Sequence, residues 1–198
     1  MKENKIKKLA SFFYEIGTLR KIPRAHQQLL LSQDLSDNIA SHSFRVAFIG
    51  YFLAKELKAD ANKVIKMCLL HDIEKSRAGD QNWVNKKYIK VFEEKIRKEQ
   101  LKDLLGSEEL TRLSKEYQEK KALEAKIVKD ADLLDENLLL REYQWRGSKE
   151  AEDWLKIKKM DEQEKLMFTD LAKEISKEIK KQNPSFWWES LWTSKRRK

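Results

Sequence analysis

The chain has 198 residues, of which 40% are hydrophobic and 38% are charged, so it can form one domain with a packed core and a densely ionic surface. Lys and Arg total 42 against 33 acidic residues, and the resulting net charge of +9 suits a phosphate-bearing or polyanionic partner. Only five Gly and two Pro occur, so few residues interrupt helices and the composition favours a mostly helical protein.

Cysteine usage and hydropathy argue against a disulfide-stabilised protein and against a membrane-spanning one. Cys68 is the single cysteine, so no disulfide can form within the chain and a reducing setting is expected. No apolar stretch reaches the roughly 18 to 20 residues that span a bilayer. The opening residues MKENKIKKLASFFYEIG lack the apolar core of a signal peptide. We therefore expect a cytoplasmic protein with no membrane span.

The first part of the chain shows helical spacing of apolar residues in three segments. These are residues 5–19, 39–58 and 61–71. Pro23 interrupts the chain between the first two, and Asp37 or Ser41 can cap the second helix. Gly79 and Asp80 mark a turn after the third helix.

The remainder of the chain continues the helical pattern. Helices are expected over residues 83–105, 107–120 and 121–146, from Ser148 onwards, and from about Asp161 to Lys181. No alternating strand pattern and no internal repeat occur. The sequence therefore predicts one all-α domain over residues 1–182 and a short aromatic and basic extension over residues 183–198.

Several aromatic residues have no chemical partner in the sequence. Trp83, Tyr88 and Phe92 recur at helical spacing, so we expect them to pack against other residues, as we do for the apolar Cys68. The C-terminal extension carries Trp187, Trp188 and Trp192, followed by the tail SKRRK. Packing on the domain is the first interpretation of these tryptophans, and a subunit interface is the second.

Histidines and acids stand on otherwise apolar helix faces at three places. His42 lies in the first turn of the second helix, His71 and Asp72 end the third, and Asp130 and Asp132 lie in the stretch IVKDADLLDE. A carboxylate on an apolar face is costly unless it is paired or bound to a metal. Nitrogen and oxygen ligands from three helices suit a divalent cation such as Mn²⁺, Co²⁺ or Mg²⁺, with positions left for water and a phosphate oxygen.

Each of these residues also has a purely structural interpretation. A single histidine on an apolar face is more often a hydrogen-bonded core residue. Asp132 alone fits a helix-surface carboxylate beside a lysine. Helical spacing does not separate Asp130 from Asp132, because each has apolar neighbours one turn away. The joint occurrence of His, then His-Asp, then Asp on three helices is what favours the metal site.

That order of residues resembles the HD-domain superfamily of metal-dependent phosphohydrolases. The stretch LLHDIEKSRAGDQNWVNKKY is similar to the branch of HD-domain 5′-deoxynucleotidases, and the similarity extends over roughly residues 19–155. The resemblance implies a compact helical bundle with a metal site between its helices. It implies His42, His71, Asp72 and Asp132 as metal ligands, with Asp130 as the competing choice for the last.

The resemblance also implies roles for residues around the metal. Arg24 would bind the substrate phosphate, Asp72 would orient the attacking water, and Asp80 would lie beside the sugar or the leaving oxygen. The branch usually carries Glu four residues after the motif histidine, where this chain has Lys75 and places Glu74 one residue earlier. Glu74, Lys75 and Asp80 therefore stay open as catalytic groups that protonate or stabilise the leaving oxygen.

Two further positions depart from the branch. Ser41 stands where a Glu often precedes the first histidine, and an aromatic residue beside Arg24 is missing unless His26 takes its place. The residues Asn85, Lys86 and Lys87 could line a phosphate site, although a solvated helix face is the simpler interpretation.

The function that the resemblance implies is release of phosphate from (deoxy)nucleoside 5′-monophosphates, by a cytoplasmic homodimer. An alternative enzymatic function uses the same metal site with a different substrate, which would be guanosine tetraphosphate, a cyclic dinucleotide or a deoxynucleoside triphosphate. A different class is a basic helical nucleic-acid-binding protein without enzymatic activity. Nucleic acid is the less favoured partner, because the basic residues alternate with acids and no recognition motif occurs.

Overall fold

A computed structural model describes residues 2–156, 164–189 and 191 of the chain. Within these residues the fold is helical and contains no strand, with Pro23 and Asn38 forming an isolated bridge. The predicted all-α fold is confirmed. None of the described helices is long and apolar enough to cross a membrane.

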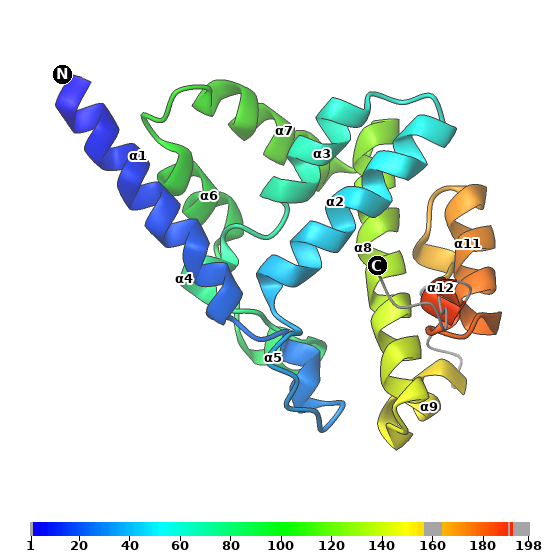
Figure 1. Cartoon of the computed structure of the whole chain (residues 1–198). Helices are drawn as coiled ribbons and strands as arrows, with labels where there is room; N and C mark the ends of the chain where they lie inside the picture. Colours follow the sequence, from blue (N-terminus) through cyan, green and yellow to red (C-terminus); the bar gives the residue numbers. More distant parts are fainter. Residues whose placement is uncertain (1, 157–163, 190, 192–198) are drawn as a thin grey trace, which may run out of the picture.

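Figure 1 shows the order of the helices along the chain. The first helices are α1 (Lys2–Gly17), α2 (Ile39–Glu56), α3 (Ala61–Leu70), α4 (Lys75–Ala78), α5 (Trp83–Tyr88) and α6 (Glu93–Leu101). They are followed by α7 (Ser107–Glu119), α8 (Leu123–Trp145), α9 (Lys149–Lys156), α11 (Asp170–Lys181) and α12 (Phe186–Glu189). Two 3₁₀ turns, Thr18–Lys21 and Ala25–Gln28, connect α1 to α2.

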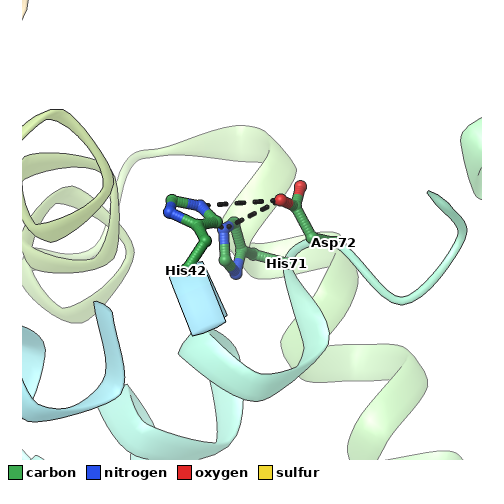
Figure 2. Close-up of side chains that lie close together, drawn as sticks. All are labelled: His42, His71 and Asp72. Atoms are coloured by element: carbon green, nitrogen blue, oxygen red, sulfur yellow. Dashed lines mark hydrogen bonds and ion pairs between the residues drawn. The ribbon is translucent and has the colours of Figure 1, made fainter. Parts of the chain in front are cut away.

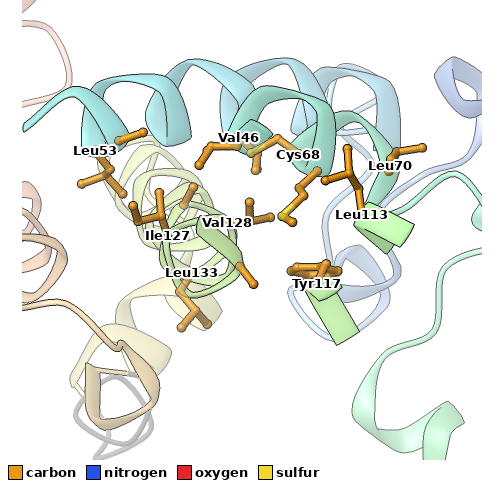
Figure 3. Close-up of a cluster of buried hydrophobic side chains, with 14 of the residues drawn as sticks. Val46, Leu53, Cys68, Leu70, Leu113, Tyr117, Ile127, Val128 and Leu133 are labelled. Carbon is orange, nitrogen blue, oxygen red and sulfur yellow. The ribbon is translucent and has the colours of Figure 1, made fainter. Parts of the chain in front are cut away.

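The core lies where α2, α3 and α8 pack together, with α7 closing one side (Figure 3). Its buried apolar residues include Val46, Leu53, Val64, Met67, Cys68, Leu113, Ile127, Val128 and Leu134. Gly50 allows α2 and α3 to approach, because a Cβ at this position would lie 2.8 Å from the Cys68 sulfur. Polar residues at the start of α2, at the end of α3 and in the middle of α8 are thereby brought close together.

The start of α2 differs from the sequence expectation. Asn38 caps the helix, its side-chain oxygen accepting a hydrogen bond from the backbone N–H of Ser41 at 3.0 Å. Asp37 instead faces the imidazole of His26, with 2.8 Å between Oδ2 and Nε2. The cap holds the first turn of α2, which carries His42.

The single helix expected over residues 83–105 is wrong. An Asn82 capping box starts α5, and Ile89 is extended at its end. The chain then resumes as α6 and leaves helical geometry again at Lys102. The β-branched residues Ile89 and Val91 lie in this break, and such residues lose side-chain freedom in a helix. The expected start of the last long helix near residue 161 lies outside the described residues, and α11 begins at Asp170.

The expected packing of aromatic residues holds only in part. The ring centroids of Trp83 and Trp154 are 4.8 Å apart. Trp83 nevertheless stays partly exposed, and Tyr88, Phe92 and Trp187 are exposed as well. Trp192 lies outside the described residues, so the boundary of the C-terminal extension stays a prediction.

Candidate metal centre

Three helices deliver the candidate ligands to one place. His42 lies in the first turn of α2, and His71 is the residue immediately after α3, with Asp72 next to it. Asp132 lies in the middle of α8. Figure 2 shows the two imidazoles and the Asp72 carboxylate pointing toward one another. The packing of α2, α3 and α8 therefore explains why residues far apart in the sequence meet.

The distances within this cluster are short. The Nε2 atoms of His42 and His71 lie 3.1 Å apart, and Asp72 Oδ2 lies 3.6 Å from the first and 3.4 Å from the second. One possible ligand atom from each of these three residues lies within 4.8 Å of the others. Asp132 Oδ1 lies 3.3 Å from His42 Nε2. Two nitrogens and the Asp72 carboxylate thus surround one small volume, and Asp132 adjoins it at His42.

The other nitrogen of each imidazole is already engaged. His71 Nδ1 lies 2.6 Å from the backbone oxygen of Cys68, and His42 Nδ1 lies 2.6 Å from the Asp135 carboxylate. Both partners only accept hydrogen bonds, so each Nδ1 carries the proton and donates. When both imidazoles are neutral, their Nε2 lone pairs face each other at 3.1 Å and repel. A cation placed there relieves this repulsion, and a divalent metal ion fits the set of donors.

The charge distribution agrees with a cation site. Burial opposes ionisation of Asp72 and Asp132, but neighbouring positive charges outweigh it and hold the pKa of both carboxyls below the usual range. Burial lowers the pKa of His71 and so favours its neutral form. Burial also acts against a charge on His42, but hydrogen bonds to Asp132 and Asp135 outweigh it and raise its pKa. The site therefore holds two ionised carboxylates and favours positive charge between them.

A second polar group adjoins the cluster. Lys75 Nζ lies 2.7 Å from Asp72 Oδ2 and 2.7 Å from Asp80 Oδ1, so one ammonium joins the two carboxylates. Asp80 follows Gly79, whose φ of 70° and ψ of 172° suit glycine almost exclusively. Asp80 Oδ2 accepts a hydrogen bond from the backbone N–H of Ala25 at 2.8 Å. This contact ties the turn after α4 to the segment that carries the predicted phosphate ligand.

Arg24 lies beside this group and is buried. Its NH1 is 3.3 Å from Asp135 Oδ2, and its Nε is 3.8 Å from Asp80 Oδ2. That Nε has no hydrogen-bond partner among the described residues. Arg24 therefore keeps donor capacity next to the cluster, although 18 residues separate it from His42 in the sequence.

A cleft of about 340 Å³ opens next to Lys75 and Asp80. Gln81, Lys86, Ile89 and Lys90 also line it. Its lining combines apolar and polar side chains and includes Lys75, whose ammonium contacts Asp72. The cleft thus offers a small molecule a path to the edge of the cluster.

Glu74 pairs with Arg97 instead of with the cluster. Glu74 Oε2 and Arg97 NH1 are 2.9 Å apart, and both side chains are buried. Burial raises the pKa of Glu74 to about 7 against the opposing charge of Arg97. Glu74 also lines the cleft. Among Glu74, Lys75 and Asp80, the candidates for the group at the leaving oxygen, Lys75 is the one whose side chain forms an ion pair with the cluster residue Asp72.

Asp130, the competing choice for the last ligand, is engaged elsewhere. Its carboxylate accepts hydrogen bonds from the backbone N–H groups of Phe168 and Thr169 and from the Thr169 hydroxyl, at 2.6 to 2.9 Å. The residue is fully buried. Asp130 therefore holds the segment before α11, while Asp132 faces His42.

Two residues at the cluster were not singled out from the sequence. Asp135 contacts His42 and Arg24, and Arg45 Nε donates to Asp135 Oδ1 at 2.5 Å. The sequence did contain a signal for Asp135, because residues three apart on a helix share a face and Asp132 precedes it by three. The signal for Arg45 is long-range, since its partners lie on α8.

The remaining phosphate-site candidates have other contacts. His26 is paired with Asp37, and Asn85 completes the Asn82 capping box. Lys86 lines the cleft, whereas the Lys87 ammonium lies 5.4 Å from the centre of the Tyr88 ring. Lys86 is thus the member of this group that lies nearest to the candidate site's cleft.

Comparison with known proteins agrees with this geometry. The HD domain family matches residues 16–176. The chain is 27% identical over 163 residues to a 5′-deoxynucleotidase of Saccharomyces cerevisiae, which is 72% of this chain and 64% of the yeast protein. A shorter match of 59 residues, 41% identical, relates 30% of the chain to 12% of Ribonuclease Y from Borreliella burgdorferi. These matches thus span less than two thirds of either relative's own length.

The solved structures extend the likeness to the whole fold. A conserved hypothetical protein from Pyrococcus furiosus superposes with a TM-score of 0.71 at 31% sequence identity, covering 87% of this chain and 99% of that one. The family match covers most of the chain, and the cluster of two histidines and an aspartate lies inside it. The chain therefore belongs to the HD-domain family, whose phosphohydrolases are metal-dependent.

Proposed function

We propose that this protein releases phosphate from (deoxy)nucleoside 5′-monophosphates. The observation that carries the proposal is the convergence of the Nε2 atoms of His42 and His71 and the Asp72 carboxylate, beside a buried arginine. The 5′-deoxynucleotidase similar to this chain supports the choice of substrate. The cytoplasmic setting and the homodimer stay predictions.

The proposed metal ligands are His42, His71, Asp72 and Asp132. When bound there, a divalent cation supplies a water of lowered pKa and neutralises charge on a phosphate oxygen. Asp72 has a second role, because it lies between the histidines and Lys75 and so orients the nucleophile at the edge of the cleft. Its low pKa keeps it an acceptor throughout the neutral range.

Arg24 is the proposed phosphate-binding residue. A planar guanidinium matches phosphate oxygens, and its charge offsets the negative charge that develops during transfer. Arg24 is buried beside the cluster and keeps a donor that no described residue satisfies. A phosphate bound between the cation and Arg24 would be held from two sides.

Lys75 is the proposed group at the leaving oxygen, and Asp80 the proposed acceptor for a sugar hydroxyl. Burial lowers the pKa of the Lys75 ammonium, but Asp72 and Asp80 outweigh it and raise the value, so the group stays charged at neutral pH. A charged ammonium can stabilise an alkoxide or donate a proton to it. Glu74 is a weaker candidate because its carboxyl already faces Arg97.

A second candidate function is hydrolysis of a phosphodiester. The short stretch of similarity to Ribonuclease Y favours it, and so does the lysine at position 75, since HDIEK echoes the HDIGK of other HD phosphohydrolases. The net charge of +9 would suit a longer anionic substrate.

The test is a panel of substrates with purified protein. Nucleoside and deoxynucleoside 5′-monophosphates, a dinucleotide and a short 5′-labelled RNA are each incubated with Mn²⁺, Co²⁺ or Mg²⁺. We expect phosphate release from the monophosphates, and a loss of at least about 100-fold in Asp72→Ala. Glu109→Ala, an exposed acid paired with Lys66 on the surface, is the control that keeps activity. Equal phosphate release by wild type and Asp72→Ala would refute the proposal, and cleavage of the dinucleotide or RNA alone would favour the second function.

A further inference from the structure

One buried carboxylate links the candidate metal ligand to the candidate phosphate ligand. Asp135 Oδ2 lies 2.6 Å from His42 Nδ1 and 3.3 Å from Arg24 NH1. Its other oxygen accepts a hydrogen bond from Arg45 Nε at 2.5 Å. Asp135 is 2% exposed. The same oxygen therefore contacts a residue from each half of the proposed site.

We propose that Asp135 is a positioning residue that sets both halves of the site, the metal-binding nitrogen of His42 and the phosphate-binding guanidinium of Arg24. The inference rests on the proposed function and names a residue that touches neither the cation nor the substrate. It predicts that metal binding and phosphate binding weaken together when Asp135 loses its charge.

The effect on His42 follows from hydrogen-bond chemistry. A carboxylate only accepts, so Asp135 fixes the proton of His42 on Nδ1 and leaves the Nε2 lone pair directed at His71 and Asp72. A hydrogen bond from a carboxylate also makes a ligating imidazole more basic and fixes the plane of its ring. His71 has a weaker version of this arrangement, since its Nδ1 donates to the neutral backbone oxygen of Cys68.

The effect on Arg24 follows from burial and charge. A buried guanidinium needs a counter-charge, and Asp135 supplies one at 3.3 Å while Asp80 lies farther away at 3.8 Å. Because Asp135 contacts NH1 only, Nε keeps its unsatisfied donor. Asp135 thus holds Arg24 in place without occupying all of its donors.

Arg45 and Glu142 fix Asp135 itself. Arg45 donates to the Asp135 side chain through Nε and to its backbone oxygen through NH2 at 3.2 Å, and its NH1 is 2.7 Å from Glu142 Oε1. Both acids lie on α8 and Arg45 lies on α2. This clamp ties α2 to α8 at the level of the cluster, so the carboxylate has little freedom to turn away.

The test compares Asp135→Asn with Asp130→Asn, a matched change of a buried carboxylate on the same helix. Mn²⁺ is titrated into each metal-free protein, and binding is measured from the electron paramagnetic resonance signal of free Mn²⁺. We expect Asp135→Asn to weaken Mn²⁺ binding by about 10- to 100-fold and Asp130→Asn to change it by less than about threefold. The binding of inorganic phosphate to the Mn²⁺-loaded protein should weaken in Asp135→Asn as well.

Arg45→Gln provides a second variant, since the Arg45 side chain is 32% exposed and its loss keeps the Asp135 charge. We expect Mn²⁺ binding to weaken by a few-fold, less than in Asp135→Asn. Nitrogen-15 NMR spectra of the metal-free protein at alkaline pH measure the tautomer of His42 without any added ligand. They should show His42 protonated on Nδ1 in the wild type and a mixture of tautomers in Asp135→Asn.

The outcomes separate this inference from the proposed function. Unchanged Mn²⁺ binding in Asp135→Asn, or an equal loss in Asp130→Asn, overturns the positioning role even if the nucleotide panel shows activity. Loss of Mn²⁺ binding in Asp135→Asn with phosphate binding intact overturns the link to Arg24. If no nucleotide is hydrolysed but the Mn²⁺ titration and the spectra follow expectation, the inference stands and the substrate proposal fails.

Discussion

Two faces of α8 carry acids in opposite circumstances, one fully buried and one partly exposed. Asp130 faces the segment before α11 and accepts three hydrogen bonds from neutral donors on Phe168 and Thr169. Asp132 faces α2, with Lys129 Nζ at 2.8 Å and His42 Nε2 at 3.3 Å. Burial raises the pKa of Asp130 despite its hydrogen bonds. The pKa of Asp132 is held well below its usual range, because Lys129 and His42 outweigh burial.

The difference between these faces teaches how to separate a structural acid from a functional one. The lone pairs of Asp130 are taken up by donors whose positions the fold requires, so nothing further is needed there. Asp132 lies among ionisable groups and keeps 22% of its side chain exposed. A carboxylate that is partly open and surrounded by charge can accept a metal ion without disrupting the fold.

The largest effect is expected from Asp132→Asn, which removes one charge from the site-facing side of α8. We expect weakened Mn²⁺ binding and a loss in kcat/KM of about 1,000-fold, since metal coordination contributes several kcal/mol to phosphoryl transfer. Metal titration and phosphate release measure the two effects. If Asp132→Asn bound Mn²⁺ as tightly as the wild type, the last metal ligand would have to be another residue. The contrast between the Asp130 and Asp132 faces of α8 would then fail.

The next largest effect concerns Lys75, which extends the site-facing region to the proposed leaving group. We expect Lys75→Gln to lower kcat on nucleoside monophosphates by about 100-fold. The loss should be much smaller with p-nitrophenyl phosphate, whose leaving oxygen needs no stabilisation. Lys90→Gln is the matched control, because Lys90 lines the same cleft and has no role in the proposed site. An equal loss with both substrates would remove Lys75 from the leaving group.

On the opposite face, Asp130→Asn tests stability instead of activity. The amide can accept only part of what the carboxylate accepts, and its NH₂ group would face N–H donors of residues 168 and 169. We expect the free energy of unfolding to fall by about 1 to 3 kcal/mol, measured by urea denaturation. Activity per folded molecule should stay within about twofold of wild type. A large loss of activity without a loss of stability would show that the two faces are not separate.

The sequence pointed to residues that lie together in the structure, but not to their contacts. His42, His71 and Asp72 stand at helix ends that pack together. Because each is a polar residue on an otherwise apolar helix face, the sequence alone indicated that they could form a site. Asp130 and Asp132 could not be separated, because residues two apart on a helix point in nearly opposite directions and only the packed neighbours tell which direction meets His42. Periodicity located both acids but not the helices beside them.

Contacts between distant segments explain what the sequence left open and where its helix boundaries were wrong. The partner of Glu74 is Arg97, 23 residues later, and no local pattern joins them. The helix expected over residues 83–105 breaks because Asn82 starts a short helix and extended residues follow it. Helix periodicity recovered most helices within a few residues, whereas pairings over long separations need the fold itself.

The smallest effect on stability is expected from a substitution of Glu15. Like Asp130, its carboxylate accepts hydrogen bonds from other side chains or backbone groups, but it lies far from α8 in the sequence. Arg77 donates to it through Nε at 2.6 Å and NH2 at 3.0 Å, and the Gln100 amide donates at 2.7 Å. The hydrogen bond from Arg77 is the main cause of its lowered pKa. The contacts join α1 to α4 and α6, so Glu15→Gln should reduce stability by about 1 kcal/mol at neutral pH, a modest value because solvent screens the partly exposed pair.

The pH dependence of this effect has a fixed sign. A carboxyl whose pKa is lower in the folded state contributes stability above its unfolded pKa, and the contribution is lost as the pH falls through its folded pKa. The stability difference between wild type and Glu15→Gln should therefore be largest near pH 7 and shrink below the ordinary value of 4.5. Urea denaturation of both proteins at several pH values measures it, and the subtraction removes the other carboxyls. A difference that grows on acidification would show that Glu15 gains nothing from its charged form, unlike Asp132, whose ionised state the site requires.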